Sequence, residues 1–461
     1  MTHRLLVIGG DAAGMSAAAT AKRRAGDALS ITVFERSTWT SYSACGIPYW
    51  VGGAVASGEE LVARTPEEHR ERGIDVRTGT TVTAIDPGGR TVTALAEDGA
   101  SSTHPYDSLL IATGAEPIRP DLPGIDGKGI HGIQTLDDGT EMLETLARKP
   151  RRAVVVGSGY IGLEMAEACV ERGIDTTVVD RGKTPLHLVD AELGEQVRAA
   201  MIGMGITVLS GTEALSFDLD EDGWVKGVDT TGEHLDADIV VLGLGVHARS
   251  TLASAAGLSV GERDGIEVDQ HQRVVGFDDI WAAGDCCLSR DRITGNLLHV
   301  PLGTHANKQG LVAGSAIALR VAGKPPLLTF PGIVRTAVTK ICDVEIARTG
   351  LGDREAKAAG IDVASATIEA TTKAGYFPGA EPMTVRMHAD RANRRIVGVQ
   401  IIGRSGSALR IDTAAMALWS GMTVDELAMT DLAYAPPFSP VWDPVQVAAR
   451  AVIKELGYLT A

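Results

Sequence analysis

The sequence predicts an α/β protein that contains two parallel, doubly wound sheets and a third α/β domain. Two observations carry this prediction. An apolar strand, a glycine turn and a helix occur at the start of the chain and again from residue 152. In both copies a second apolar strand follows and ends in an acid, Glu35 or Asp180. This arrangement is typical of a Rossmann-like unit, which binds the ribose and pyrophosphate of a dinucleotide.

Chain length, net charge and cysteine content limit the class of protein. A chain of 461 residues is too long for a single core, and a net charge of −16 disfavours binding to a nucleic-acid backbone. No apolar run reaches the length of a membrane span, and the chain starts with a charged residue and a strand where a signal peptide would be apolar. Five cysteines without paired or zinc-type spacing predict a reducing, cytoplasmic setting and no metal site.

The first unit runs from Arg4 through the glycine turn to Glu35, with Gly9 and Gly14 at the outer positions of the turn. Asp11 stands where a second glycine is expected. A pyrophosphate would repel a carboxylate at this point unless the side chain turned away. A helix N-cap is an equally good interpretation of Asp11.

The second unit has the full pattern, with Gly157, Gly159 and Gly162 in the turn and Asp180 after the next strand. The backbone N–H groups of the turn and the helix N-terminus are expected to hold the pyrophosphate of NAD(P)H. Asp180 favours NADH, because it can accept from a 2′-hydroxyl and would repel a 2′-phosphate. Arg181 and Lys183 lie close by in the sequence, so use of NADPH stays open.

Two further apolar strands bracket the second unit. Residues 106–115 close on the turn Thr113-Gly114-Ala115, and residues 280–285 end in Asp285. Open α/β sheets bind ligands at such carboxyl ends. A ferredoxin-like or flavin domain that is split by an inserted nucleotide domain would give this order.

We therefore expect an FAD domain of residues 1–115 and 247–325, an NAD(P)H domain of residues 116–246 and a C-terminal domain of residues 326–461. The C-terminal domain changes character: β-branched residues alternate over 332–339, a helical pattern follows near 406–420, and proline is frequent over 434–444.

Cys45 is the candidate redox residue, in the segment Ser-Tyr-Ser-Ala-Cys-Gly-Ile-Pro-Tyr at residues 41–49. A cysteine held next to a dinucleotide indicates thiol redox chemistry. We expect it near the N-terminal end of a short helix over the flavin, where the helix dipole and the ring would lower its pKa. The alternative is a buried structural cysteine. The other cysteines are predicted to be packing or inert residues: Cys169, Cys286, Cys287 and Cys342.

Taken together, these motifs resemble the pyridine nucleotide–disulfide oxidoreductases over essentially the whole chain. Most members of that family carry two cysteines a few residues apart, whereas here Thr40 stands in place of the first and only Cys45 remains. The pattern resembles the single-cysteine branch, which contains coenzyme A-disulfide reductases, NADH oxidases and NADH peroxidases. Oxidases and peroxidases of the branch usually carry a histidine where this chain has Ala12, and reductases often have asparagine where it has Ala44. Two C-terminal segments match the reductases: residues 375–379 and 432–437.

The resemblance implies FAD and NADH as cofactors and coenzyme A as substrate or bound thiol. Glu35 would bind the adenosine ribose of FAD, Asp285 would bind its ribitol chain, and Thr113 and Gly114 belong to the same site. Glu164 would face the flavin edge. Tyr160 would cover the nicotinamide pocket, although packing on the sheet is an equal alternative.

The resemblance also implies a homodimer, because Tyr376 and Tyr434 would reach the partner's Cys45 and donate a proton to the leaving thiolate. Lys22 and Arg23 begin a basic run that ends at Arg24. This run is either a clamp for coenzyme A phosphates or a solvated helix end. The remaining candidates for substrate binding are Ser41 and Tyr42.

The expected reaction is FAD-dependent reduction of a low-molecular-weight disulfide, above all coenzyme A disulfide, by NAD(P)H through Cys45. Persulfides and polysulfides would suit the same pocket. One alternative is an NADH oxidase in which Cys45 cycles through a sulfenic acid, which Ala12 disfavours. Another is an electron-transfer reductase for a protein partner or a quinone, or an idle FAD/NAD-binding sensor; Cys45 would then be dispensable.

Overall fold

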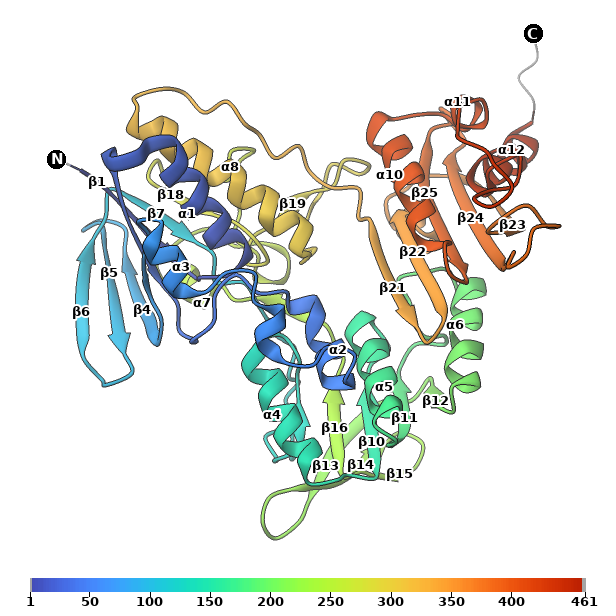
Figure 1. Cartoon of the computed structure of the whole chain (residues 1–461), viewed down its shortest axis with the longest axis horizontal. Coiled ribbons are helices and arrows are strands. Elements are labelled where there is room, and N and C mark those ends of the chain that lie inside the picture. Colours follow the sequence, from blue (N-terminus) through green and yellow to red (C-terminus); the bar gives the residue numbers. More distant parts are fainter. Residues whose placement is uncertain (1, 458–461) are drawn as a thin grey trace.

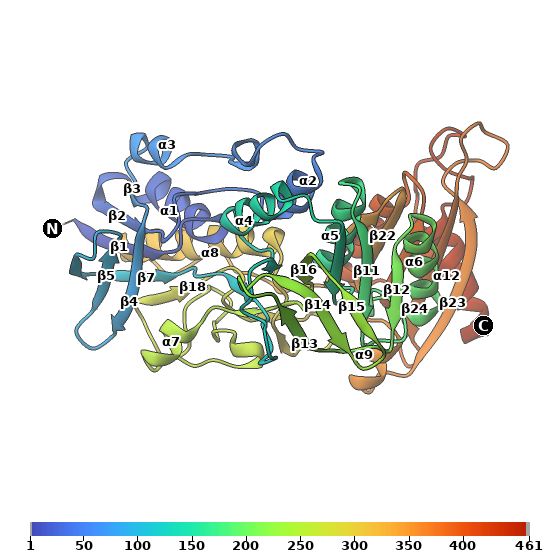
Figure 2. The ribbon, with the colours of Figure 1, turned by 90° about the horizontal axis from the view of Figure 1, so that it is seen from below.

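The computed structural model describes residues 2–457. Its sheets form three groups along the long axis, with the N-terminal group at one end and the C-terminal group at the other (Figures 1 and 2). Within these residues, no helix combines the length and the apolar character needed to cross a bilayer.

The first sheet is parallel and has the strand order β18-β7-β1-β2-β3. Helices α1 (Ala12–Ala25) and α8 (Gly303–Val321) share an apolar core with one face of it. A Cβ at Gly314 would overlap the carbonyl oxygen of Ala17, so the two helices touch backbone to backbone. The strands are β1 (His3–Ile8), β2 (Leu29–Phe34), β3 (Asp75–Arg77), β7 (Ser108–Ile111) and β18 (Ile280–Ala282).

The second sheet repeats this plan with the order β12-β11-β10-β16-β9. Its apolar residues divide between two cores, one of which it shares with α4 (Leu136–Ala147), α5 (Tyr160–Glu171) and α6 (Ala191–Gly203). The repeat seen in the sequence is therefore a repeat of structure. The strands are β9 (Ile130–His131), β10 (Arg152–Val156), β11 (Asp175–Asp180), β12 (Thr207–Ser210) and β16 (Ile239–Leu242).

Each parallel sheet shares its other core with a small antiparallel sheet of three strands. Between the two units the chain crosses twice, in an antiparallel ribbon of β8 (Ala115–Pro117) and β17 (Val246–Ala248). Both limits expected for the NAD(P)H domain, 115/116 and 246/247, fall in this ribbon. The small sheets contain β4 (Thr80–Asp86), β5 (Thr91–Ala96) and β6 (Ser101–Pro105), and β13 (Ala214–Leu219), β14 (Val225–Thr230) and β15 (His234–Asp236).

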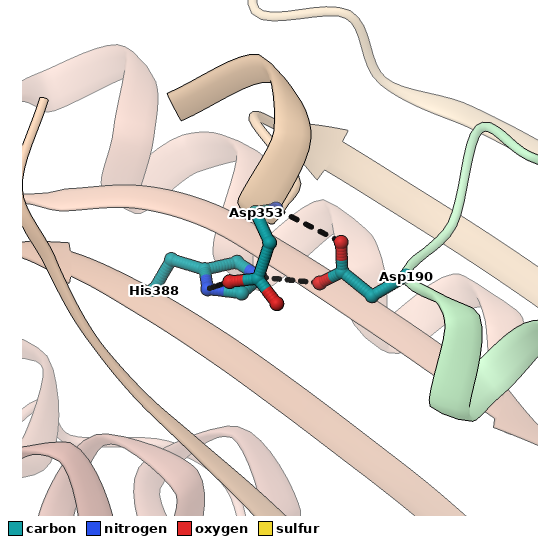
Figure 3. Close-up of side chains that lie close together, drawn as sticks. All are labelled: Asp190, Asp353 and His388. Carbon is teal, nitrogen blue, oxygen red and sulfur yellow. Dashed lines mark hydrogen bonds and ion pairs between the residues drawn. The ribbon is translucent and has the colours of Figure 1, made fainter. Parts of the chain in front are cut away.

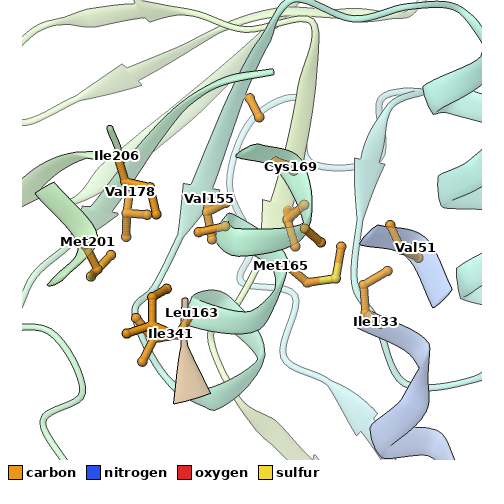
Figure 4. Close-up of a cluster of buried hydrophobic side chains, with 14 of the residues drawn as sticks. Val51, Ile133, Val155, Leu163, Met165, Cys169, Val178, Met201, Ile206 and Ile341 are labelled. Carbon is orange, nitrogen blue, oxygen red and sulfur yellow. The ribbon is translucent and has the colours of Figure 1, made fainter. Parts of the chain in front are cut away.

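The segment that carries Cys45 leaves the first unit and packs on the second. It forms a 3-10 turn, η2 (Ala44–Gly46), that runs directly into α2 (Ile47–Gly52). Ile47 and Val51 are fully buried in the core that α4 and α5 share with the second sheet. Figure 4 shows Val51 in this core. Trp50 packs so closely on α4 that a Cβ at Gly139 would lie 2.7 Å from its ring.

The C-terminal sheet is antiparallel, with the order β21-β22-β25-β24-β23. The strand pattern expected over 332–339 is wrong for its first half: Gly332 and Arg335 have φ of 98° and 57°, which strands do not accommodate. The helix expected near 406–420 is present as η5 (Ala408–Arg410) and α10 (Ile411–Ser420). The other elements are β21 (Ala337–Ile341), β22 (Val344–Gly350), β23 (Val363–Thr371), β24 (Pro382–Asp390), β25 (Ile396–Gly403), α9 (Asp353–Ala358), α11 (Val424–Ala428) and α12 (Pro444–Leu456).

An ion cluster that surrounds the buried His388 joins the C-terminal sheet to the second unit (Figure 3). Asp190, which precedes α6, accepts from His388 Nε2 at 2.8 Å and from the backbone N–H of Asp353 at 2.8 Å. Arg386 pairs with Asp190 at 2.9 Å and with Asp353 at 2.7 Å. The three residues of Figure 3 are of types that bind metals, but the guanidinium already supplies positive charge to both carboxylates. We therefore interpret the cluster as a brace between domains.

The remaining short elements connect these units. They are η1 (Gly26–Ala28), η3 (Gly58–Leu61), α3 (Pro66–Glu71), α7 (Thr251–Ala255), η4 (Glu262–Asp264), β19 (Ser289–Arg290) and β20 (Leu297–Leu298).

Candidate active site

One cavity of about 2540 Å³ extends from the first glycine turn to the second. It is large enough for more than one ligand of cofactor size. Most residues that the sequence singled out line it, and they come from both units: Gly9, Arg23, Glu35, Ser41, Tyr42, Cys45, Thr113, Gly114, Gly157, Gly159, Tyr160, Glu164, Asp180 and Asp285.

The first glycine turn is shaped by close backbone contacts. Gly9 has φ of 107°, and a Cβ at Gly14 would overlap the carbonyl oxygen of Gly9. Gly14 does not line the cavity; its lack of a side chain allows α1 to start directly against the turn. Glu35 Oε2 accepts from the backbone N–H of Gly10 at 2.7 Å, which fixes the acid at the edge of the turn.

The second turn has the same construction. Gly157 has φ of 99°, and a Cβ at Gly162 would overlap the carbonyl oxygen of Gly157. Asp180 is buried and accepts from the backbone N–H of Ser158 at 2.7 Å and from its hydroxyl at 2.5 Å. The N–H of Gly182 donates to the other oxygen at 2.5 Å. Glu35 and Asp180 therefore occupy equivalent positions in the two units.

The residues between the turns fit a flavin nucleotide. Thr113 Oγ1 donates to the carbonyl of Arg249 at 2.6 Å, and Gly114 has φ of 72°. Burial raises the pKa of Asp285 to about 6. Gly284 has φ of 87°, and a Cβ there would lie 2.8 Å from Cβ of Ala13. Any side chain would thus close the space between the strand end and α1, where the dinucleotide of such units passes.

Cys45 lies in η2, directly before α2, as expected for a thiol near a helix start, and its side chain is exposed to the cavity. The electrostatics differ from the expectation. Burial, together with the carboxylates of Glu164 and Asp285, raises the pKa of Cys45. The expected lowering of this pKa is therefore not produced by the chain's own groups, because burial disfavours the thiolate and two acids face it.

Glu164 lies on α5, one turn after Tyr160. Burial raises the pKa of Glu164 to about 7, although the carboxylate accepts from Thr339 Oγ1 at 2.9 Å. Such a carboxyl can take up and release a proton near neutral pH. Burial also raises the pKa of Tyr160, to about 12.

Asp11 turns away from the helix that it precedes. It occupies the N-cap position of α1 but makes no side-chain cap bond. Its Oδ1 accepts from the backbone N–H of Tyr42 at 3.0 Å. Burial, with Glu35 and Asp285 nearby, raises the pKa of Asp11 to about 7. The capping interpretation is thus wrong for the side chain, which ties the glycine turn to the Cys45 segment.

The basic residues at the end of α1 have different surroundings. Lys22 Nζ contacts the carbonyl of Gly26 at 3.3 Å and Asp27 at 3.4 Å, and it does not line the cavity. Arg23 does line it. Sequence reasoning missed two further cavity residues, Arg64 and His69, because they follow Cys45 in a segment without a motif.

Tyr376 and Tyr434 lie outside this cavity, with 77% and 45% of their surfaces exposed. A hydrogen bond with Tyr376 raises the pKa of Tyr434, so the two hydroxyls are neighbours. Among the remaining cysteines, Cys169, Cys286 and Cys287 are buried, which agrees with packing roles, and Cys342 is half-buried.

Fold and cavity together define an oxidoreductase with separate sites for a flavin and a nicotinamide nucleotide. Residues 3–310 match the family described as pyridine nucleotide-disulphide oxidoreductase, and residues 336–444 match the dimerisation domain of that family. The chain belongs to this family, as the sequence motifs predicted. It is therefore an enzyme that uses FAD and NAD(P)H.

Similar proteins have different activities in their names. An NAD(P)H coenzyme A polysulfide/persulfide reductase of Pyrococcus horikoshii is 35% identical over 98% of this chain and 99% of its own. An NADH oxidase of Methanocaldococcus jannaschii is 34% identical over 98% of this chain and 99% of its own. The structure of an NAD-dependent persulfide reductase from A. fulgidus superposes with a TM-score of 0.93 and 34% identity, over 98% of this chain and 83% of that one.

Proposed function

We propose that this protein uses NAD(P)H to reduce a disulfide or persulfide of coenzyme A, with Cys45 as the redox-active thiol. The observation that carries the proposal is the exposure of Cys45 to the same cavity that both glycine turns and Asp285 line. The coenzyme A persulfide reductase among the relatives supports the substrate class.

The chain's own chemistry centres on Cys45. Its thiolate attacks one sulfur of the substrate, the S–S bond breaks, and a mixed disulfide with coenzyme A forms as the other sulfur leaves as a thiolate or hydrosulfide. FAD, when bound, passes the two electrons of NAD(P)H to the thiol site. These electrons and a proton convert the mixed disulfide to the Cys45 thiolate and free coenzyme A. Glu164, with a pKa of about 7, is suited to exchange the proton.

The other assignments follow the same proposal. Glu35, Thr113, Gly114 and Asp285 hold FAD, whereas the second turn and Asp180 hold NADH, with Tyr160 over the nicotinamide. Two chains form a homodimer in which Tyr376 and Tyr434 of one protect and protonate the thiol site of the other, in the cytoplasm. Strongly exposed apolar side chains on the C-terminal domain support such an interface: Leu409, Met416, Met429, Phe438 and Val441.

Substitution of Cys45 by serine tests the proposal. Cys45→Ser should bind FAD and accept electrons from NADH, because neither process uses the thiol. Its turnover with coenzyme A disulfide should fall by orders of magnitude, since a serine hydroxyl has too high a pKa to attack sulfur. Cys342→Ser, which changes a half-buried thiol of the C-terminal domain, is the matched control. Wild-type turnover by Cys45→Ser with every acceptor would favour electron transfer to a protein or quinone.

NADH oxidase activity is the second candidate, and the relative of that name supports it. Ala12 lines the cavity where oxidases of the family carry a histidine, so the chain lacks that proton donor. Ala12→His should raise oxygen consumption relative to disulfide reduction. Oxygen turnover that exceeds disulfide turnover in the wild-type protein would make the oxidase the better assignment.

A further inference from the structure

Thr339 of the C-terminal domain is hydrogen-bonded to Glu164, an acid in the wall of the cavity. Its strand, β21, packs on α5, because Ile341 of β21 lies in the same apolar core as Leu163 of α5 (Figure 4). Thr339 is buried, and its Oγ1 donates to Glu164 Oε1 at 2.9 Å, whereas the carbonyl of Lys340 is 3.5 Å away. Thr339 itself does not line the cavity, so its hydroxyl acts there only through Glu164.

Glu164 has few other partners for its charge. Within residues 2–457, it makes no further side-chain hydrogen bond and no ion pair. A carboxylate in such surroundings tends to take up a proton. Burial accordingly raises the pKa of Glu164 to about 7, and the hydrogen bond from Thr339 opposes this rise. Thr339 thus stabilises the ionised form of Glu164.

The charged groups near Glu164 leave this role to Thr339. Glu167 lies one turn further along α5 and would repel the Glu164 carboxylate. Lys340 Nζ pairs with Glu167 at 2.6 Å, so the ammonium is already used there. The same ammonium lies 5.8 Å from the ring centroid of Tyr49 on α2. The titratable groups that face Glu164 are Cys45, Tyr49, Tyr160, Glu167 and Lys340.

The charge of Glu164 influences how readily Cys45 ionises. Burial raises the pKa of Cys45, and the Glu164 carboxylate raises it further. While Glu164 holds its proton, this repulsion is absent and the thiolate forms at a lower pH. A contact that moves the proton equilibrium of Glu164 therefore also changes the thiolate fraction of Cys45.

We propose that Thr339 is a positioning residue that holds Glu164 as a carboxylate in the cavity wall and so sets the pH at which Glu164 releases its proton beside Cys45. Thr339 lies in the segment that matches the dimerisation domain, so this domain acts on the thiol site through β21. The inference rests on the proposed function, in which Glu164 exchanges the proton of the reaction, and names the residue that governs the exchange.

The test is the pH dependence of Cys45 alkylation by iodoacetamide in the reduced, FAD-loaded protein, because only the thiolate reacts. Cys342→Ser is the parent, in which every cysteine except Cys45 is buried. Thr339→Val should move proton release by Glu164 upward by roughly one pH unit, the effect of losing one hydrogen bond to a charged group. Between about pH 7 and pH 8, Cys45 should therefore be alkylated faster than in the parent. The alkaline limb of kcat with coenzyme A disulfide should move upward by the same amount.

Three variants isolate the hydrogen bond. Thr339→Ser keeps the hydroxyl and should retain the parent profile. Thr367→Val is the matched control, because Thr367 Oγ1 donates to Glu192 at 3.1 Å between the same two domains but outside the cavity. In a Glu164→Gln background, Thr339→Val should have no further effect on alkylation, since both changes act on one interaction.

An unshifted profile of Thr339→Val, an equal change of rate at every pH, a shift that persists with Glu164→Gln or the same shift in Thr367→Val would overturn the inference. If Thr339→Val does not fold, Thr339→Ala, which also removes the hydroxyl, is compared with Thr339→Ser in the same way. A wild-type protein that does not reduce coenzyme A disulfide or persulfide would contradict the proposed function, and the alkylation profiles would still decide the role of Thr339.

Discussion

Replacement of Asp11 by asparagine should stabilise the FAD-free protein in a pH-dependent way. The amide oxygen that Asp11→Asn introduces can still accept from the N–H of Tyr42, so the substitution removes the charge and keeps the contact. Burial raises the pKa of Asp11 from 3.8 to about 7. A raised pKa means that the folded state holds a proton that the unfolded state has already released.

The sign and size of the stability difference between wild type and Asp11→Asn follow from this linkage. Below about pH 4 both the folded and the unfolded state carry the proton, so Asp11 does not lower the free energy of unfolding. As pH rises towards 7, the folded protein loses stability relative to the asparagine variant. At roughly 1.4 kcal/mol for each pKa unit, the full difference is about 4 kcal/mol, reached above pH 7.

Urea unfolding of both proteins, followed by tryptophan fluorescence between about pH 4 and pH 8.5, measures the effect. Asp27→Asn, in the exposed turn η1 that follows α1, removes an equal charge from solvent and is the control. The reasoning is refuted if the curves of Asp11→Asn and wild type stay parallel over this range, or if Asp27→Asn reproduces the divergence.

Three further outcomes are expected. Asp285→Ala should weaken FAD binding, and an unchanged flavin stoichiometry and affinity after dialysis would contradict its assignment. Asp180→Ala should move the ratio of kcat/KM from NADH towards NADPH; a wild-type enzyme that strongly prefers NADPH would show that Arg181 and Lys183 dominate instead. Sedimentation should give a dimer, and Tyr376→Phe with Tyr434→Phe should lower disulfide turnover while flavin reduction by NADH is retained; a fully active monomer would exclude a shared site.

The sequence predicted the two nucleotide units because their geometry depends on local patterns. Gly14 and Gly162 lie where a helix starts against the carbonyl of its own glycine turn, and any side chain there would overlap that carbonyl. Glycine is therefore required at the same spacing in both units. The family and its cofactors followed from these patterns. The pairing of Asp11 with Tyr42, and of Ser41 with His69, joins residues far apart in the chain. No spacing rule encodes such contacts. The raised pKa of Cys45 likewise depends on burial and on acids from distant parts of the chain.

The placement of α2 on the second unit sets a rule for anyone who recombines these enzymes. Ile47 and Val51 are fully buried against α4 and α5, although they lie far earlier in the chain than α5. A chimera that takes only residues 116–246 from a relative would place foreign side chains against Trp50. It would thereby change the surface on which the Cys45 segment packs. Grafts should therefore carry residues 44–61 together with the second unit, and activity lost in simple swaps should return when this segment is included.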